Sequence, residues 1–400
     1  MPEAHWLESA SPAFRLMIAT SWLAPDSWQS NQEEAIRGAI AAGPDWTEYL
    51  NLVDRHRTPA LSWAALQRVA GLEIPEQAKL ELQKRSDACR MQAVRHSLLL
   101  AQVLKAFNRA GIPVMMMKGP ILSIELYGDV GLRQSHDLDI ACALEDIPKS
   151  QTLLENSGWR HDSAWFPLSP RQWESLLRHE QEIQFIDSQS TTLLELHWRN
   201  PWDQPGHYSE CWERSIPTIW QGCTHQEMDP IDKVLYLCNH GGIHAWFRAK
   251  WLGDMARIHA TGHVDWEAAL ERGRSMSQER PLLACLQLLH IAHGLPLPSL
   301  QGKPWENLPA FLLDSPLHAL KDSKDPVAPS FWDVVSILRR LTRYKRLVLR
   351  GRTWRESLSE IAYCREDFRV LPLPDSLFWA YAPLRPILSI WRKIRRIWAR

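Results

Sequence analysis

The first part of the chain repeats apolar and polar positions with a helical period. Residues 76–107 form a long pattern of apolar and charged positions near the 3.6-residue period, and the segment SNQEE at 30–34 is typical of a capped helix start. The segment AGIP at 110–113 is expected to end the long helix. We therefore expect residues 1–95 to form a helical N-terminal region.

Short apolar runs then replace the helical pattern. The run 114–117 leads into Lys118, Gly119 and Pro120, which predicts a buried strand, a turn and a new helix that lasts until Gly128. The segment 132–142 alternates apolar residues with two aspartates and predicts a second strand.

A helix over 145–156 and two strands over 182–186 and 192–198, joined by a polar turn, complete this unit. Residues 96–200 are thus predicted to form a small α/β core with a mixed sheet. The predicted fold class is α+β, with this core embedded in mostly helical flanking regions.

Helical patterns return after residue 201. The clearest span 232–258 and 281–293, and a proline-bearing stretch up to Pro329 is typical of a linker. Another helix is expected over 332–350. We expect a helical domain at 201–300 that completes the cleft, and a C-terminal helical region at 301–400.

Composition narrows the function classes. Lys and Arg number 46 and Asp and Glu also number 46, so the whole chain has no net attraction for nucleic acid or anionic membrane. Seven scattered cysteines without a CxxC pair argue against a zinc ribbon or a thioredoxin-type site. We see no signal peptide and no apolar run of about 18 residues, so we expect a cytoplasmic protein without a transmembrane helix.

Three carboxylates carry the candidate chemistry. Asp137 and Asp139 lie two apart in a predicted strand and therefore share one face, as do Glu195 and His197 in a later strand. If the strands pair, the carboxylates converge and repel one another unless a cation lies between them. Mg²⁺ (or Mn²⁺) bound there suits phosphoryl or nucleotidyl transfer. An isolated DxD pair is also common as two solvated aspartates at a strand edge.

The motifs across about residues 96–260 resemble the uncharacterised nucleotidyltransferase family of the DNA polymerase β-like superfamily. They are listed in chain order: Lys118-Gly119, Leu126-Tyr127, Leu132-Arg133, Asp137-Leu138-Asp139-Ile140, Leu194-Glu195-Leu196-His197-Trp198, Asn239-His240-Gly241 and Trp251-Leu252-Gly253-Asp254. The resemblance implies a polymerase β-type core, an NTP substrate, and Asp137, Asp139 and Glu195 as catalytic metal ligands.

The chain departs from the superfamily pattern at the first turn. Lys118-Gly119 stands where Gly-Ser is usual, and we expect Lys118 to act as a point charge on the triphosphate. Arg133 is either a phosphate ligand or a surface residue at the strand entrance. His197 is either structural or a partner of Glu195, and His240 and Asp254 are candidates to line the cleft. His240 and His244 have the spacing of two metal ligands, but the HExxH pattern is absent.

The sequence therefore favours a Mg²⁺-dependent transfer of a nucleoside monophosphate to an unidentified small molecule, peptide, protein or RNA. The alternative is a catalytically inactive nucleotide-binding regulatory or scaffold protein. Two basic runs lie at 339–346 and 391–398. In the second, Trp391, Ile394 and Trp398 share a helical stripe between arginines, so we expect residues 377–400 to contact a membrane surface or RNA.

Overall fold

The computed structural model describes residues 6–161, 167–190, 192–199, 207–322 and 363–398. Within these ranges the strands form one mixed sheet in the order β3-β4-β5-β2-β1-β7-β6. The strands are β1 (Met115–Met116), β2 (Asp137–Ala141), β3 (Trp159–His161), β4 (Glu182–Asp187), β5 (Leu193–His197), β6 (Ile216–Trp220) and β7 (Cys223–Glu227). The pairs β2–β5 and β1–β7 are parallel and the others antiparallel, which confirms the predicted α+β class.

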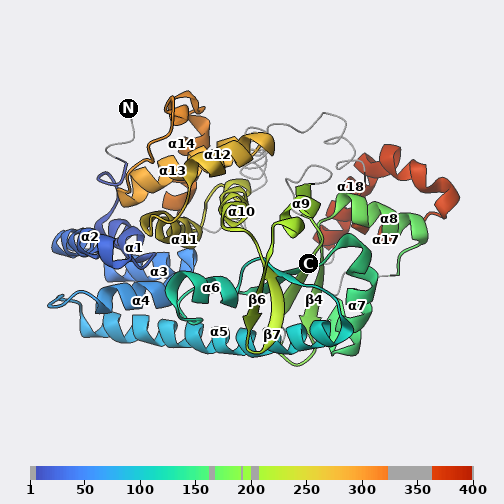
Figure 1. Cartoon of the computed structure of the whole chain (residues 1–400), viewed down its shortest axis with the longest axis horizontal. Coiled ribbons are helices and arrows are strands. Elements are labelled where there is room, and N and C mark those ends of the chain that lie inside the picture. Colours follow the sequence, from blue (N-terminus) through green and yellow to red (C-terminus); the bar gives the residue numbers. More distant parts are fainter. Residues whose placement is uncertain (1–5, 162–166, 191, 200–206, 323–362, 399–400) are drawn as a thin grey trace.

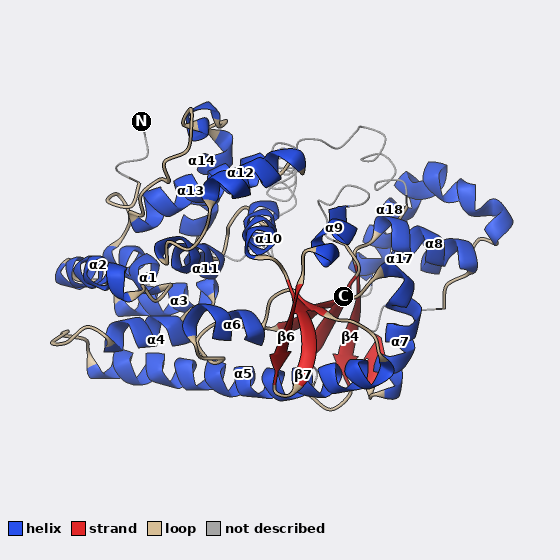
Figure 2. Ribbon diagram, viewed as in Figure 1, coloured by secondary structure: helices blue, strands red, loops and turns tan. Residues whose placement is uncertain are grey.

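Helices from residues 12–67 and 230–321 share one apolar core beside the sheet (Figures 1 and 2). They are α1 (Pro12–Thr20), α2 (Gln29–Ala41), α3 (Trp46–His56), α4 (Pro59–Gln67), α10 (Pro230–Ile243), α11 (Ala249–Ala260), α12 (Trp266–Ser275), α13 (Glu279–His293) and α14 (Phe311–Lys321). The division of the chain into four regions stays a prediction, but this packing joins residues of the first and third regions.

The long helix α5 (Glu76–Ala110) links this helical core to a second apolar core at the sheet. It runs beneath both the helical body and the sheet (Figure 1). Leu82 in its first half belongs to the helical core, whereas Leu100, Leu104 and Phe107 in its second half pack under the sheet. The sheet core also receives residues of α6 (Pro120–Tyr127), α7 (Ile147–Asn156) and α8 (Pro170–His179).

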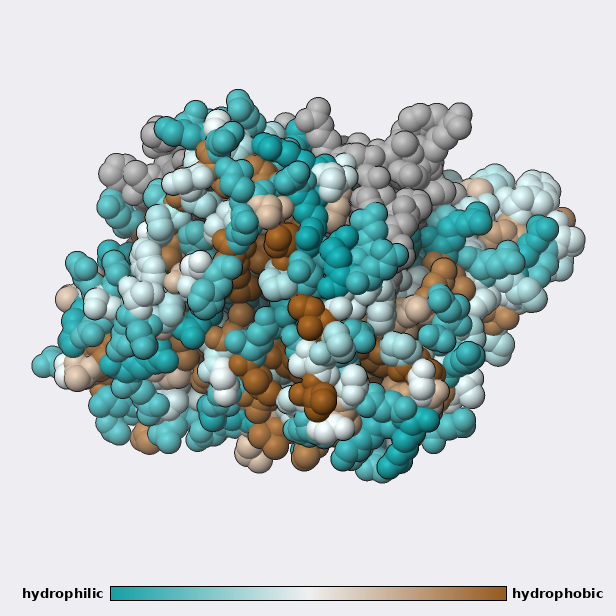
Figure 3. Space-filling model, viewed as in Figure 1, coloured by the Kyte–Doolittle hydropathy of each residue, from teal (hydrophilic) through white to brown (hydrophobic). Residues whose placement is uncertain are grey.

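A small third cluster joins the C-terminal segment to α8. It contains Phe368 of α17 (Arg365–Val370) and Tyr381 and Leu388 of α18 (Tyr381–Trp398). No helix in the described ranges has both the length and the apolar run needed to cross a membrane. Side chains of mixed polarity cover the visible surface, and apolar ones gather near its centre, where β6 and β7 lie (Figure 3).

Three predicted segments differ from the structure. The hairpin of β6 and β7 lies in the region where mainly helices were expected, and the predicted helix 232–258 is two helices separated by residues 244–248. The stretch expected to be a linker up to Pro329 contains α14. The helix expected over 332–350 and the basic run 339–346 lie outside the described residues.

Candidate active site

Parallel pairing of β2 and β5 brings the predicted acids together. Asp139 lies directly opposite Glu195, and His197 follows two residues later on the same face of β5. Single ligand atoms of these three residues all lie within 4.8 Å of one another. His197 Nε2 is 3.5 Å from both an Asp139 oxygen and a Glu195 oxygen. We call Asp139, Glu195 and His197 the acidic cluster.

The turn after β1 delivers Lys118 to this cluster. Gly119 has a φ of 80°, a conformation that suits glycine, and it precedes Pro120 at the first position of α6. This backbone places Lys118 Nζ 2.8 Å from Oδ1 of Asp139. Lys118 therefore contacts an acid of the cluster. The phosphate role expected for Lys118 and Gly119 stays a prediction.

Burial and mutual charge set the protonation of the cluster. Burial alone would raise the pKa of Asp139, but Lys118 and His197 outweigh it and hold this pKa below its usual range. Burial acts in the opposite direction on His197 and alone would lower its pKa. Asp139 and Glu195 outweigh burial and raise the pKa of His197 to about 10. Burial raises the pKa of Glu195 to about 7, with a contribution from Asp139. Two cationic side chains thus compensate the acids when no metal is bound.

A divalent cation fits this donor set. Oδ2 of Asp139 is buried and has no hydrogen-bond partner among the described residues. Buried polar atoms without such partners are rare and often mark a missing ligand. Two carboxylates suit Mg²⁺, and an imidazole beside them also suits Mn²⁺.

Asp137 lies outside this tight group. It is half-buried at the start of β2, where Ser135 Oγ lies 3.3 Å from Asp137 Oδ1. Strand alternation still puts Asp137 on the same face as Asp139. The structure thus brings two of the three predicted carboxylates into contact range and leaves Asp137 beside them.

Arg133 and Asp254 form a buried ion pair. Arg133 Nε donates to Asp254 Oδ2 at 2.8 Å, and the two side chains are 2% and 1% exposed. The pair fastens the loop before β2 to α11. The phosphate role of Arg133 and the cleft role of Asp254 stay predictions.

Three further residues around the cluster were not singled out from the sequence. Glu182 on β4 lies 3.4 Å from His197 Nδ1. Lys250 on α11 donates to the carbonyl of Gln134 at 2.8 Å, and burial lowers its pKa to about 7. Tyr236 on α10 is buried beside Lys118. For Lys250 the sequence did contain a signal: it lies four residues before Asp254, so the two side chains share one helix face.

His240 lies on α10, one turn beyond Tyr236. Burial holds its pKa well below the usual value, so the ring is neutral. The charge of Lys118 also lowers its pKa, and the charge of Asp139 raises it. The described residues contain one candidate metal-binding group, and it does not include His240 or His244.

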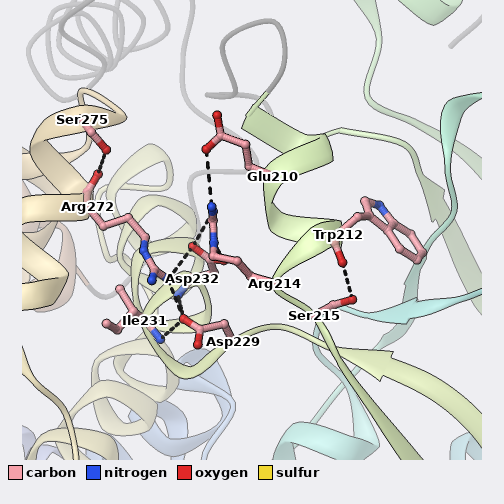
Figure 4. Close-up of polar contacts among 9 residues, drawn as sticks. All are labelled: Glu210, Trp212, Arg214, Ser215, Asp229, Ile231, Asp232, Arg272 and Ser275. Atoms are coloured by element: carbon pink, nitrogen blue, oxygen red, sulfur yellow. Dashed lines mark hydrogen bonds and ion pairs between the residues drawn. The ribbon is translucent and has the colours of Figure 1, made fainter.

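An ionic network fixes the start of α10 (Figure 4). Asp229 caps the helix by accepting from Ile231 N at 3.1 Å. Asp232, in its first turn, accepts from Arg214 Nε at 2.8 Å and from Arg272 Nη1 at 3.2 Å. Arg272 belongs to α12 and Arg214 to the segment that leads into β6, so the network ties α10 to both. Asp232 makes these contacts as a buried residue. The network therefore positions the helix face that carries Tyr236 and His240.

Comparison with known proteins gives a match to a protein family. Residues 42–294 match a family described as uncharacterised nucleotidyltransferase. This range is wider than the 96–260 covered by the motifs, and it includes the whole sheet and α10 to α13. No curated protein and no solved structure matches the chain.

Proposed function

The chain belongs to the uncharacterised nucleotidyltransferase family, and on that premise we propose that it moves a nucleoside monophosphate from an NTP to an acceptor. The acceptor is a small molecule, a peptide, a protein or an RNA. In this reaction an acceptor atom bonds to the α-phosphorus while the bond to the bridging oxygen breaks, and pyrophosphate leaves. The convergence of Asp139, Glu195 and His197, whose ligand atoms lie within 4.8 Å of one another, carries the proposal.

A divalent cation, Mg²⁺ or Mn²⁺, is the cofactor in this proposal. Asp139 and Glu195 would hold it, with Asp137 as the third carboxylate on the same sheet face. When bound, the cation supplies charge stabilisation for the transferring phosphoryl group.

Lys118 has a second task in this scheme. A cation at Asp139 would compete with its ammonium for the same oxygen, and the freed ammonium would be available to a triphosphate oxygen. Gly119 lets the backbone turn there, and His197 orients Glu195 through their 3.5 Å contact. Arg133 as a phosphate ligand, and His240 and Asp254 as cleft residues, remain part of the proposal.

One observation favours the rival function, an inactive nucleotide-binding regulatory or scaffold protein. Converging acids would need a metal if nothing else compensated them. Here Lys118 and His197 both lie within ion-pair distance of Asp139. The cluster can therefore fold without a cation, so metal binding is not required for its stability.

Location and further contacts complete the proposal. All seven cysteines are free thiols, which suits the reducing cytoplasm proposed as its location. Residues 377–400 are proposed to touch an anionic membrane surface, with RNA as the alternative. Exposed Trp379, Ile387 and Trp391 in this segment support contact with an apolar or interfacial partner.

The test is transfer of label from each α-labelled NTP with Mg²⁺ or Mn²⁺ to the protein, RNA or a cell-extract metabolite. We expect transfer by the wild type and none by Asp139→Asn. An Asp139→Asn protein with the full wild-type rate would refute the catalytic assignment. Nucleotide binding without transfer under every condition would favour the regulatory function.

A further inference from the structure

Aromatic and imidazole rings cluster where α10 meets α11, mostly in edge-to-face contacts. Tyr236 and His240 on α10 and His244 at its C-cap recur every fourth residue and so share one face over two turns, about 12 Å. Ring centroids are 6.2 Å apart for Tyr236 and His240, and 4.8 Å apart for His240 and His244. Trp251 of α11 adds its ring 5.1 Å from His240, and Phe247 lies 5.0 Å from Trp251. We call these five residues the ring wall.

One end of the ring wall lies at the candidate active site. Tyr236 forms a side-chain hydrogen bond with Lys118, the lysine that pairs with Asp139. His240 is still within the influence of both charges. The wall therefore leads away from the position proposed for the phosphates.

The far end of the ring wall is open to solvent. His244 is exposed, and Phe247 and Trp251 are half-buried. Rings that served only to pack α10 against α11 would be sealed, as the neighbouring Trp246 is at 0% exposure. The exposed ring of His244, with the half-buried rings of Phe247 and Trp251 beside it, instead offers a surface for a flat ligand.

The corner that presents these rings is strained. Ala245 and Trp246 have φ angles of 49° and 51°, in the left-handed region that residues other than glycine seldom adopt. Such conformations cluster at functional sites, where the surrounding structure enforces them. Here Trp246 is held against Gly241, where even a Cβ would lie 2.4 Å from its ring.

We propose that the ring wall binds the nucleobase of the NTP by stacking. This inference rests on the proposed function and adds the base site to it. Every nucleobase has a π-face, and stacking on aromatic side chains tolerates different bases. With phosphates at Lys118, the base of the same nucleotide extends along α10 towards His244 and Trp251. Purines, which have the larger face, bind more tightly than pyrimidines.

Equilibrium binding of non-cleavable α,β-methylene ATP, the corresponding CTP analogue and inorganic tripolyphosphate, each with Mg²⁺, tests this site. His244→Ala changes an exposed residue and should leave the fold intact. We expect it, and Trp251→Ala, to weaken binding of the ATP analogue by roughly 5- to 150-fold, the range for loss of one stacking partner. Tripolyphosphate binding should change less than twofold, and Trp251→Phe should retain most of the affinity.

His263→Ala is the matched control, because His263 is exposed just beyond the far end of α11. It should bind all three ligands like the wild type. Unchanged binding of the ATP analogue by His244→Ala and Trp251→Ala would refute the base site, as would an equal loss of nucleotide and tripolyphosphate. If the wild type binds neither nucleotide nor tripolyphosphate, the proposed function itself fails, and the base site with it.

Discussion

The ammonium of Lys118 lies 2.8 Å from an oxygen of Asp139, and the two side chains are only 11% and 1% exposed. This pair occupies the centre of the candidate active site, where a cation would need the same carboxylate. Lysine and metal are therefore expected to compete for Asp139. Such a competition would keep one arrangement of acids stable both with and without a metal.

Replacing Lys118 by methionine should expose this competition. In EDTA we expect Lys118→Met to lower the free energy of unfolding by about 3–5 kcal/mol, because it leaves Asp139 buried without its main counter-charge. Added Mn²⁺ should then raise the melting temperature more than it does in the wild type, since no ammonium has to be displaced.

Lys233→Met provides the control for Lys118→Met. Lys233 pairs with the exposed Glu125 at 2.6 Å and with Glu227 at 3.6 Å. Its loss should cost roughly 1 kcal/mol or less and leave the response to Mn²⁺ unchanged. Equal Mn²⁺-induced shifts in Lys118→Met and the wild type would contradict competition at Asp139.

Breaking the buried Arg133–Asp254 ion pair should also destabilise the protein. Asp254→Asn leaves a buried guanidinium without its counter-charge and should cost about 3–5 kcal/mol in urea unfolding. The double variant Arg133→Met/Asp254→Leu removes both charges and should recover most of that loss. If it were no more stable than Asp254→Asn, the pair would not be the cause.

The same double variant also tests the phosphate role predicted for Arg133. Its affinity for the ATP analogue is compared with that of the wild type under conditions where both are folded. Weaker binding supports a role of the Arg133–Asp254 pair in the nucleotide site. Retained binding assigns the residue to packing between the loop before β2 and α11.

The sequence predicted the central strands because their side chains alternate strictly. Asp137 and Asp139 alternate with buried Leu138 and Ile140, and Glu195 alternates with buried Leu194 and Leu196. This pattern placed the acids on one face of each strand. It could not establish that β2 pairs with β5, because strand order depends on contacts that are distant in sequence.

Other features had weaker signals or none. The hairpin of β6 and β7 turns through Gln221 and Gly222, both with positive φ, and a two-residue turn with glycine was a readable signal. Pro217 obscured it, because proline argues against a strand interior. The break between α10 and α11 bends at Ala245 and Trp246, and neither residue type indicates a left-handed backbone.

The close approach of Gly241 to Trp246 predicts a local packing effect. Because a Cβ at Gly241 would lie 2.4 Å from the buried ring, we expect Gly241→Ala to destabilise the protein by about 1–3 kcal/mol or more. Gly38→Ala in α2 is the matched control, since a Cβ there meets nothing within 4 Å. It should be neutral or stabilising by about 0.5–1 kcal/mol. Equal urea midpoints for the two variants would contradict the packing argument.

We expect the C-terminal helix α18 to bind anionic membranes through its own arginine residues. Arg392→Gln/Arg395→Gln/Arg396→Gln should reduce co-sedimentation with phosphatidylglycerol vesicles at least tenfold, since each basic residue near such a surface contributes roughly 1 kcal/mol. These substitutions lie beyond Leu388, the last member of the cluster that packs α18 against α17, so the fold should persist.

Removing three charges from the basic run 339–346 separates the effect of charge on α18 from the effect of overall net charge. Arg339→Gln/Arg340→Gln/Arg343→Gln changes the net charge equally and should leave vesicle binding unchanged. An equal loss in both triple variants would mean that overall charge, and not α18, drives the binding. Retention of RNA by the wild type, without binding to vesicles at low salt, would assign the segment to RNA, because the same arginines can neutralise phosphates of either partner.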